Sequence, residues 1–379
     1  MIDDHVHPFP LAFAPFDTGE LGLDVDPAPG AAARRRALAP GRLHVHLLET
    51  RLAAFLDLPA DLPPGALAAA RDELARRDWP GYLRRLFDHA GLAGMIVDEA
   101  LHPDDPARPA AAYTAAAGRP VWKMARVDPL VDRLVGAGAT AAEILERVQG
   151  FLADSAAGGA VAVKTVLAYR TGLGVRPDAD LAAAERSLAE DVPVRRRGKA
   201  LRDLVFRTVL GTATELGLPV QVHTGFGDSE IRLAESDPLL LEEVLRTPEG
   251  TAATVVLIHG SFPWAEQAAY LATARPNLWV ELSLSNLFAP LHTADRLLRL
   301  LDVAPRGRLL LGSDGHGIPE TQWFACRVLA GAWSRVAATL AAAGARPGWI
   351  ADTRAALFAG NARTVYRLDV PTPTPEESR

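Results

Sequence analysis

The chain begins with Met1-Ile2-Asp3-Asp4-His5-Val6-His7, in which one residue separates two histidines. Side chains alternate between the two faces of a β-strand, so a strand over residues 2–7 places His5 and His7 on one face. Two imidazoles on one face can bind a single metal ion. An ordinary surface strand could carry the same pair, so the pair alone leaves both interpretations open. Three later stretches favour the metal site: Val222-His223-Thr224, Ile258-His259-Gly260 and Gly312-Ser313-Asp314-Gly315-His316.

Length and composition restrict the class of protein. The 379 residues, 49% hydrophobic and with a net charge of -6, are enough for one large barrel or two ordinary domains. No basic stripe suggests nucleic-acid binding. The single cysteine, Cys326, excludes an intrachain disulfide and favours a cytoplasmic location. Because the N-terminus lacks an apolar signal segment and no run approaches ~18 apolar residues, we expect neither secretion nor a membrane span.

Eight short apolar runs predict β-strands: residues 2–7, 94–97, 121–127, 160–168, 219–223, 253–259, 278–282 and 308–314. Helical patterns separate nearly all of them: residues 141–155, 178–217 (broken near Pro193), 239–246, 264–274, 294–301, 320–343 and 353–366. This alternation is typical of βα units with a parallel sheet. Eight units favour an α/β fold of the (β/α)8 TIM-barrel type. An open doubly wound sheet is the alternative, but no glycine-rich phosphate loop follows the first strand.

The connection over residues 8–91 is the irregular part of the predicted barrel, which spans residues 1–370. Helical patterns at 64–77 and 79–90 make it a helical insertion after strand 1, which could cover a site as a lid. His44-Val45-His46 repeats the spacing of the first pair, but it has no clear strand context and we do not interpret it as a metal site. Residues 371–379 predict a flexible tail.

In a barrel of this type, functional residues collect at the C-terminal ends of the strands. Histidines, acidic residues and a lysine fall at or near these ends: His5, His7, Lys164, His223, His259, Glu281 and Asp314. Imidazole and carboxylate are the usual ligands of a divalent metal such as zinc or manganese. Such a metal lowers the pKa of bound water to about 7, which supplies hydroxide near neutral pH. No Gly-x-Ser-x-Gly nucleophile motif occurs in a suitable setting, and we expect Cys326 to be a packing residue.

These residues, in this strand order, resemble the amidohydrolase superfamily and specifically its amidohydrolase-2 branch. Four segments narrow the resemblance to the FluG-type amidohydrolase domain: residues 164–173, 222–228, 259–264 and 313–320. The resemblance spans most of the chain, ends at residues 360–363 and is weakest over 8–91. In fungi and plants such domains are joined to a glutamine-synthetase-like domain. The chain is too short to include that domain, so the resemblance implies the free-standing form.

The resemblance also implies roles for the site residues. His5, His7, His223 and Asp314 would bind the metal, and Asp314 would also accept a proton. His259 would bind a second metal or orient the water and polarise the substrate. Lys164 would be carboxylated and bridge two metals in a binuclear enzyme, whereas mononuclear members lack that bridge; an ordinary salt bridge is the alternative. We therefore expect one or two divalent ions, with zinc favoured over manganese.

Residues after the strands are candidate substrate contacts. Arg170 could hold a substrate carboxylate through two parallel hydrogen bonds, or it could cap a loop at the surface. Tyr169, His316 and Glu281 are further predicted contacts with the substrate. Trp264 and Phe226 could form apolar walls, although core packing is the default for aromatic residues.

Three functions remain in competition. The first is metal-dependent hydrolysis of the C–N bond of a small amide, with a γ-glutamyl amide as the specific candidate. The second is metal-dependent decarboxylation of an aromatic or unsaturated acid, for which apolar walls around a planar substrate would be diagnostic. The third is a barrel kept for binding or assembly. The expected partner is a small molecule, and a homo-oligomer remains open.

Overall fold

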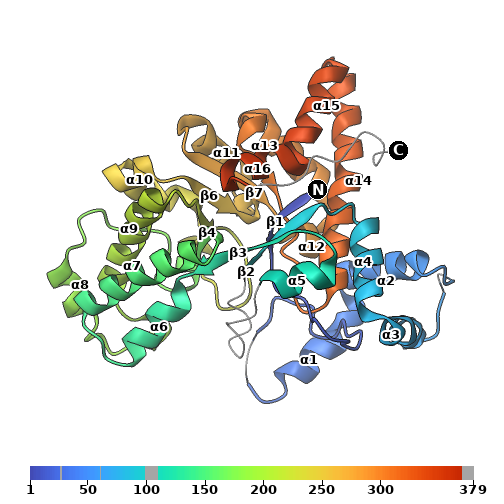
Figure 1. Cartoon of the computed structure of the whole chain (residues 1–379), viewed down its shortest axis with the longest axis horizontal. Helices are drawn as coiled ribbons and strands as arrows, with labels where there is room; N and C mark the ends of the chain where they lie inside the picture. Colours follow the sequence, from blue (N-terminus) through green and yellow to red (C-terminus); the bar gives the residue numbers. More distant parts are fainter. Residues whose placement is uncertain (26–27, 60, 99–109, 369–379) are drawn as a thin grey trace.

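The computed structural model describes residues 1–25, 28–59, 61–98 and 110–368, so the predicted tail lies outside the described residues. Its eight strands form one parallel sheet in chain order (Figure 1). They are β1 (Ile2–Val6), β2 (Gly94–Asp98), β3 (Val121–Arg126), β4 (Ala160–Thr165), β5 (Val220–His223), β6 (Val255–Ile258), β7 (Leu278–Leu282) and β8 (Leu309–Leu311). Backbone hydrogen bonds of 2.9 Å, from Asp314 N–H to the His5 carbonyl and from His7 N–H to the Gly315 carbonyl, join the two edges. The predicted (β/α)8 barrel is thereby confirmed.

Helices cover the outside of the sheet, which explains why the strands are apolar on both faces. They are α5 (Ala110–Ala117), α6 (Asp128–Gly136), α7 (Ala141–Ala157), α8 (Leu181–Ser187), α9 (Lys199–Leu216), α10 (Pro248–Ala252), α11 (Ala265–Ala274), α12 (Ser285–Phe288), α13 (Thr293–Val303), α14 (Pro319–Ala342), α15 (Pro347–Ala355) and α16 (Asn361–Tyr366). A capping box begins α7, because the Thr140 and Glu143 side chains each accept a hydrogen bond from the other residue's backbone N–H.

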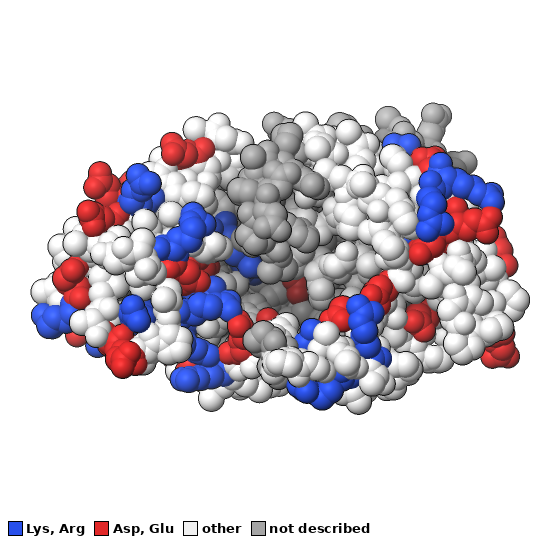
Figure 2. All heavy atoms as spheres, turned by 90° about the horizontal axis from the view of Figure 1, so that it is seen from below, with Lys and Arg blue, Asp and Glu red and all other residues white. Residues whose placement is uncertain are grey.

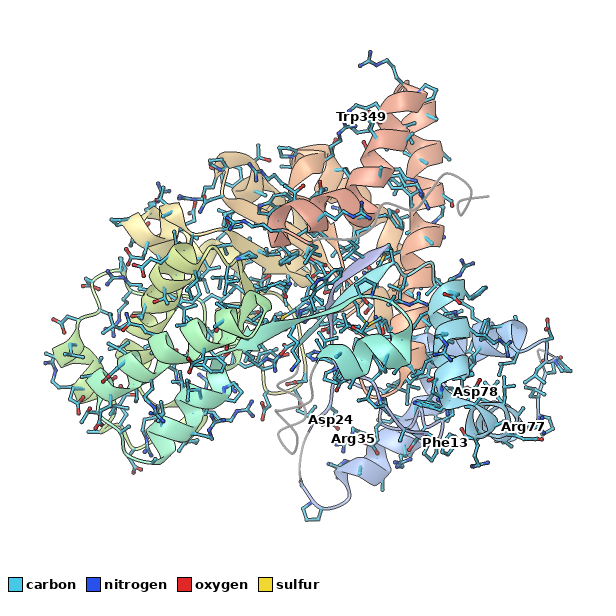
Figure 3. The ribbon with its side chains drawn as sticks, in the orientation of Figure 1. Phe13, Asp24, Arg35, Arg77, Asp78 and Trp349 are labelled. Atoms are coloured by element: carbon cyan, nitrogen blue, oxygen red, sulfur yellow. The ribbon has the colours of Figure 1, made fainter. Side chains whose placement is uncertain are left out.

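The insertion after β1 folds into four helices on one side of the barrel (Figure 1): α1 (Ala31–Leu38), α2 (Leu43–Phe55), α3 (Ala66–Arg77) and α4 (Trp79–His89). The predicted helices at 64–77 and 79–90 are confirmed as α3 and α4. Phe13 and Asp78 mark this side in Figure 3, whereas Trp349, on α15, lies at the top of the same view. A role of the insertion as a lid stays a prediction.

A buried ion pair attaches the insertion to the barrel. Arg71 Nε of α3 donates a hydrogen bond of 2.7 Å to Glu320 Oε1 of α14, and Tyr82 Oη of α4 donates one of 2.6 Å to the same oxygen. Both charged side chains are fully buried. Because Glu320 lies on α14, soon after the end of β8, this contact joins the insertion to the element that follows Asp314.

Two predicted elements differ from the structure. The predicted strand 160–168 ends at Thr165, because the Asp128 carboxylate accepts the Val166 N–H at 2.8 Å and draws the chain away from the sheet. The predicted helix 239–246 is wrong: two 3-10 turns, Pro238–Leu241 and Val244–Arg246, take its place. Pro248 disfavours helical geometry at the preceding residue, so a helix over this segment could not continue into α10. The pattern over 178–217, expected to break near Pro193, forms two helices, α8 and α9, which lie on either side of that residue.

The long helix α14 carries Cys326, which is buried as expected of a packing residue. Neither α14 nor any other helix in the described part of the chain has the length and apolar character needed to cross a membrane.

Candidate metal centre

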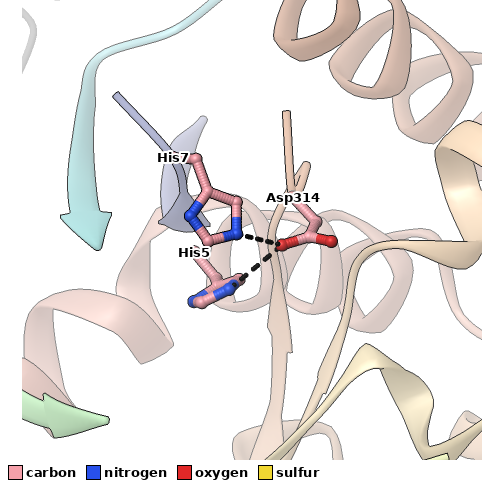
Figure 4. Close-up of side chains that lie close together, drawn as sticks. All are labelled: His5, His7 and Asp314. Carbon is pink, nitrogen blue, oxygen red and sulfur yellow. Dashed lines mark ion pairs between the residues drawn. The ribbon is translucent and has the colours of Figure 1, made fainter. Parts of the chain in front are cut away.

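Three predicted ligands converge where the first and last strands meet (Figure 4). His5 lies in β1 and His7 just after it, while Asp314 follows β8. His5 Nε2 lies 3.1 Å and His7 Nε2 3.3 Å from Asp314 Oδ1. All three side chains are buried, and their candidate ligand atoms lie within 4.8 Å of one another. As predicted from the alternation of side chains along a strand, His5 and His7 lie close together, and with Asp314 they form a compact set of donors.

A hydrogen bond with Gln221 shows which nitrogen of His5 faces the site. Its Nδ1 lies 2.8 Å from Gln221 Oε1, and Gln221 Nε2 donates to the Asp4 carbonyl and to Tyr366 Oη. Because the amide nitrogen is committed to these two acceptors, Oε1 must accept the proton of His5 Nδ1. His5 Nε2 therefore carries a lone pair toward Asp314. Outer hydrogen bonds of this kind commonly orient metal-binding histidines.

A fourth predicted ligand, His223, ends β5. Its Nε2 is buried and has no hydrogen-bond partner among the described residues. Its Nδ1 lies 2.9 Å from His259 Nε2. The structure thus brings His223 and His259 together, and it leaves on His223 an orphaned nitrogen of the kind that a metal ion satisfies.

The donor set fits a divalent cation. Burial, together with the nearby Lys164 charge, lowers the pKa of His5 to about 4, so this imidazole is neutral at pH 7. Asp314 Oδ1 has no hydrogen-bond donor in the described part of the chain, although two histidine nitrogens lie beside it. Crowded lone pairs repel unless a cation lies between them. Neutral imidazole with carboxylate is a ligand set typical of zinc or manganese.

Lys164 lies beside these donors, with Nζ 3.4 Å from His5 Nε2. The side chain is buried, and burial together with the Arg126 charge lowers the pKa of Lys164 to about 8. Within the described ranges Lys164 forms no salt bridge, so the ordinary ion pair considered from the sequence is not found. Its position is compatible with both predicted roles, the bridge between two metals and a contact with substrate.

The backbone is strained at the same place. Among the few described non-glycine residues with positive φ are His259 (69°), Leu284 (32°) and Asp314 (53°). Such conformations cost about 1–3 kcal/mol each and cluster at functional sites. All three residues border one cavity at the C-terminal ends of the strands.

This cavity has a volume of roughly 320 Å³. It is lined by the predicted metal ligands, by Lys164, His259, Tyr169, Arg170 and His316, and by insertion residues Glu20, Gly22, Leu23 and Val25. Figure 2, which views the molecule from below Figure 1, shows a hollow near its centre with basic and acidic side chains around it. The insertion therefore contributes directly to the site.

The predicted substrate contacts fall into two groups. Arg170 is buried rather than at the surface. Arg170 Nε donates a hydrogen bond of 2.9 Å to Asp132, while Arg170 Nη1 has no partner among the described residues. Tyr169 Oη accepts the Asp228 N–H at 3.1 Å, and His316 stacks on Phe288. These residues line the cavity, whereas Glu281, Trp264 and Phe226 are absent from its lining. Direct contact of Glu281 with substrate is therefore not supported by its position.

Sequence reasoning missed several residues of the site. Arg126 ends β3 and pairs with the buried Asp98, which ends β2. Burial raises the pKa of Asp98, but Arg126 and the other nearby cations outweigh it and lower the value to about 2. Both residues occupy strand ends, so the rule that located the histidines could also have found them. Gln221 lies two residues before His223 in β5, and the strand period signals their shared face.

Comparison with known proteins follows from this geometry. The sequence profile of the amidohydrolase family matches residues 2–368. The chain belongs to the amidohydrolase family. Protein fluG of Emericella nidulans is 28% identical over 377 residues, covering 89% of this chain and 42% of that protein, so the chain spans less than half of this relative.

Two solved structures share the barrel. One is a provisionally assigned metal-dependent hydrolase from Lactobacillus casei, with TM-score 0.82 and 23% identity over 97% of this chain and 94% of that one. The other is a uronate isomerase from Bacillus halodurans, with TM-score 0.65 and 15% identity over 97% and 93%. At these identities the likeness shows the fold. The resemblance inferred from the sequence is confirmed at the level of the family.

Proposed function

We propose that this amidohydrolase hydrolyses the C–N bond of a small amide that carries a carboxylate, with a γ-glutamyl amide as the specific candidate. One observation supports this above all. The lone-pair donors of His5, His7, His223 and Asp314 border the same cavity as two guanidinium groups, Arg126 and Arg170, each with a buried N–H that lacks a partner among the described residues. A substrate with an anionic end and a carbonyl end matches these two sets of groups.

The four ligand residues supply the metal-binding part of the reaction. A divalent ion held there would polarise the substrate carbonyl and make a water molecule more acidic. The Asp314 carboxylate would take the proton of the attacking water and return it to the amine nitrogen as the C–N bond breaks. Lys164 adds a positive charge beside His5, which favours negative charge on the carbonyl oxygen.

Arg170 would bind the substrate carboxylate through its free Nη1. Asp132 holds the other side of the guanidinium and also accepts a hydrogen bond of 2.8 Å from Arg202. The Asp132 carboxylate is therefore shared between two guanidinium groups, and Arg170 Nη1 is left without a partner among the described residues. This unpartnered donor favours an anionic substrate group.

Decarboxylation of a planar acid is the second candidate. The observation in its favour is an apolar and aromatic wall on the cavity, made by Leu284, Phe288, Tyr169 and His316. In that reaction the carboxylate would face the histidines rather than Arg170. The two candidates therefore place the acid group beside different residues of the cavity.

A single assay separates them. Zinc- or manganese-loaded enzyme is given a γ-glutamyl amide, the matching amide without a carboxylate, and a planar aromatic acid, while amine and carbon dioxide are measured. We expect amine release, a KM for the carboxylated amide raised about tenfold or more in Arg170→Met, and little change for the neutral amide. Asp132 keeps Arg202 as its partner in that variant. Carbon dioxide without amine, or an equal effect on both amides, would reject the amide proposal.

A further inference from the structure

We infer that His259 is a positioning residue for His223: a hydrogen-bond chain Glu281–Ser283–His259–His223 fixes the tautomer of His223 so that its Nε2 lone pair faces the metal centre. This inference rests on the proposed metal centre and assigns a role to Ser283, which the sequence did not indicate. It also replaces the two roles expected of His259, binding of a second metal and direct polarisation of the substrate.

The hydrogen-bond chain begins at Glu281 in β7. Its Oε2 accepts the His259 backbone N–H at 2.9 Å and lies 2.7 Å from Ser283 Oγ. An unprotonated carboxyl oxygen can only accept, so the single proton of the Ser283 hydroxyl is donated to Glu281 Oε2. Ser283 Oγ must then act as the acceptor toward its other neighbour, His259 Nδ1, at 2.7 Å.

Both ring nitrogens of His259 are thereby committed. Nδ1 carries the proton that Ser283 accepts, so Nε2 carries the lone pair. That lone pair accepts the proton of His223 Nδ1 at 2.9 Å. With neither nitrogen free, His259 cannot coordinate a metal in this arrangement or donate a proton to substrate.

The consequence falls on His223. Because its Nδ1 carries the proton, its Nε2 is the unprotonated nitrogen, and this is the buried atom that lacks a partner. A neutral histidine binds a metal only through an unprotonated nitrogen. If the chain ran in reverse, Glu281 would donate to Ser283 and a proton would end on His223 Nε2. That proton would point into the cavity and oppose metal binding.

Burial holds the residues of this hydrogen-bond chain in place. Glu281, Ser283 and His259 are buried, and the left-handed backbone of His259 (φ 69°) is held by its N–H bond to Glu281. Burial and the neighbouring Asp4 raise the pKa of Glu281 well above its usual value. The oxygen near Asp4 is Glu281 Oε1, since it and Asp4 Oδ1 both lie close to Gly312, so a proton shared with Asp4 would lie on Oε1 and Oε2 would remain the acceptor.

The test uses the full chain with 15N-labelled histidine rings, metal-free and zinc-loaded. Ring nitrogen chemical shifts identify the tautomer of each histidine, and a competition titration gives the zinc dissociation constant. Ser283→Ala removes the acceptor for His259. Ser285→Ala is the matched control, because Ser285 is also buried and its hydroxyl has no partner in the described residues. Glu281→Gln is the conservative variant, since its amide oxygen can replace Oε2 as acceptor.

In metal-free wild type we expect a proton on Nδ1 of both His223 and His259. Ser283→Ala should weaken zinc binding about 10- to 100-fold and change the His223 tautomer, as for other outer hydrogen bonds of metal ligands. Ser285→Ala and Glu281→Gln should retain both properties. A proton on Nε2 of His223, or unchanged zinc affinity in a folded Ser283→Ala, would overturn the inference.

Two outcomes separate this inference from the proposed function. The wild-type spectrum decides the tautomer even if Ser283→Ala fails to fold. If wild type binds no zinc but carries the expected proton on His223 Nδ1, the metal-dependent function is rejected, while the hydrogen-bond chain and the tautomer that it fixes are supported. If zinc binds but His223 carries its proton on Nε2 in the metal-free chain, the metal centre stands and the positioning role fails.

Discussion

Removing one partner of the Arg71–Glu320 pair should strongly destabilise the protein. In Arg71→Met the fully buried Glu320 carboxylate keeps the Tyr82 hydroxyl at 2.6 Å, while its Oε2 still has no partner among the described residues. Breaking a buried ion pair in this way costs about 3–5 kcal/mol, because the remaining charge is uncompensated. Loss of the guanidinium packing on the Trp79 and Tyr82 rings, at 5.0 Å from each centroid, acts in the same direction.

Equilibrium urea unfolding followed by tryptophan fluorescence measures this loss. Arg77→Met on the same helix is the matched control, since Arg77 pairs with Glu73 at the surface and should cost about 0.5 kcal/mol or less. Adding Glu320→Gln to Arg71→Met should recover part of the loss, because the orphaned charge is then absent. A loss below about 1 kcal/mol in Arg71→Met, or strict additivity of the two changes, would refute the reasoning.

Three further predictions concern the site. Zinc at about 100 times its dissociation constant should raise the free energy of unfolding of wild type by about 2.7 kcal/mol. A calorimetric scan should show a much smaller rise in His7→Ala. The pKa of Asp98 is about 2 in the folded chain against a usual 3.8, so its contribution, about 2 kcal/mol, is present above pH 4 and is lost as pH falls toward 2. Asp98→Asn should flatten acid unfolding over that interval, and an unchanged curve would contradict the pairing with Arg126. A Cβ at Gly227 would lie 1.8 Å from Tyr169 Oη, so Gly227→Ala should displace that ring and lower kcat/KM about tenfold or more, whereas retained activity would remove Tyr169 from the site.

Most of the fold was predictable because the barrel strands are buried on both faces. Their apolar runs are short, and turn or helix signals bound them. One departure arose where a side chain from another element acts on the backbone. Asp128 ends β4 by binding the Val166 N–H, and no local pattern reveals that contact, which joins residues 38 apart in the chain. The other departure is local. The apolar pattern over 239–246 predicted a helix, although Pro248 just after it disfavours helical geometry at the preceding residue.

The candidate ligands were predictable for a similar reason. His5 and His7 follow the strand period, and His223 and Asp314 fall at strand ends, so topology alone brings them together. The supporting residues were harder to find. Gln221 and Ser283 are ordinary polar residues until their partners are known, and their importance comes from hydrogen bonds to His5 and His259. Glu281 looked like a substrate contact because it lies near a strand end, yet its carboxyl group lies behind His259.

We propose that His5, His7, His223 and Asp314 form a metal centre. Metal analysis of zinc-supplemented protein should compare wild type with Asp314→Ala. We expect about one or two zinc ions per chain in wild type and less than about a tenth of an ion in the variant, with the variant still folded. Equal metal content in the two proteins, or no metal in either, would contradict it.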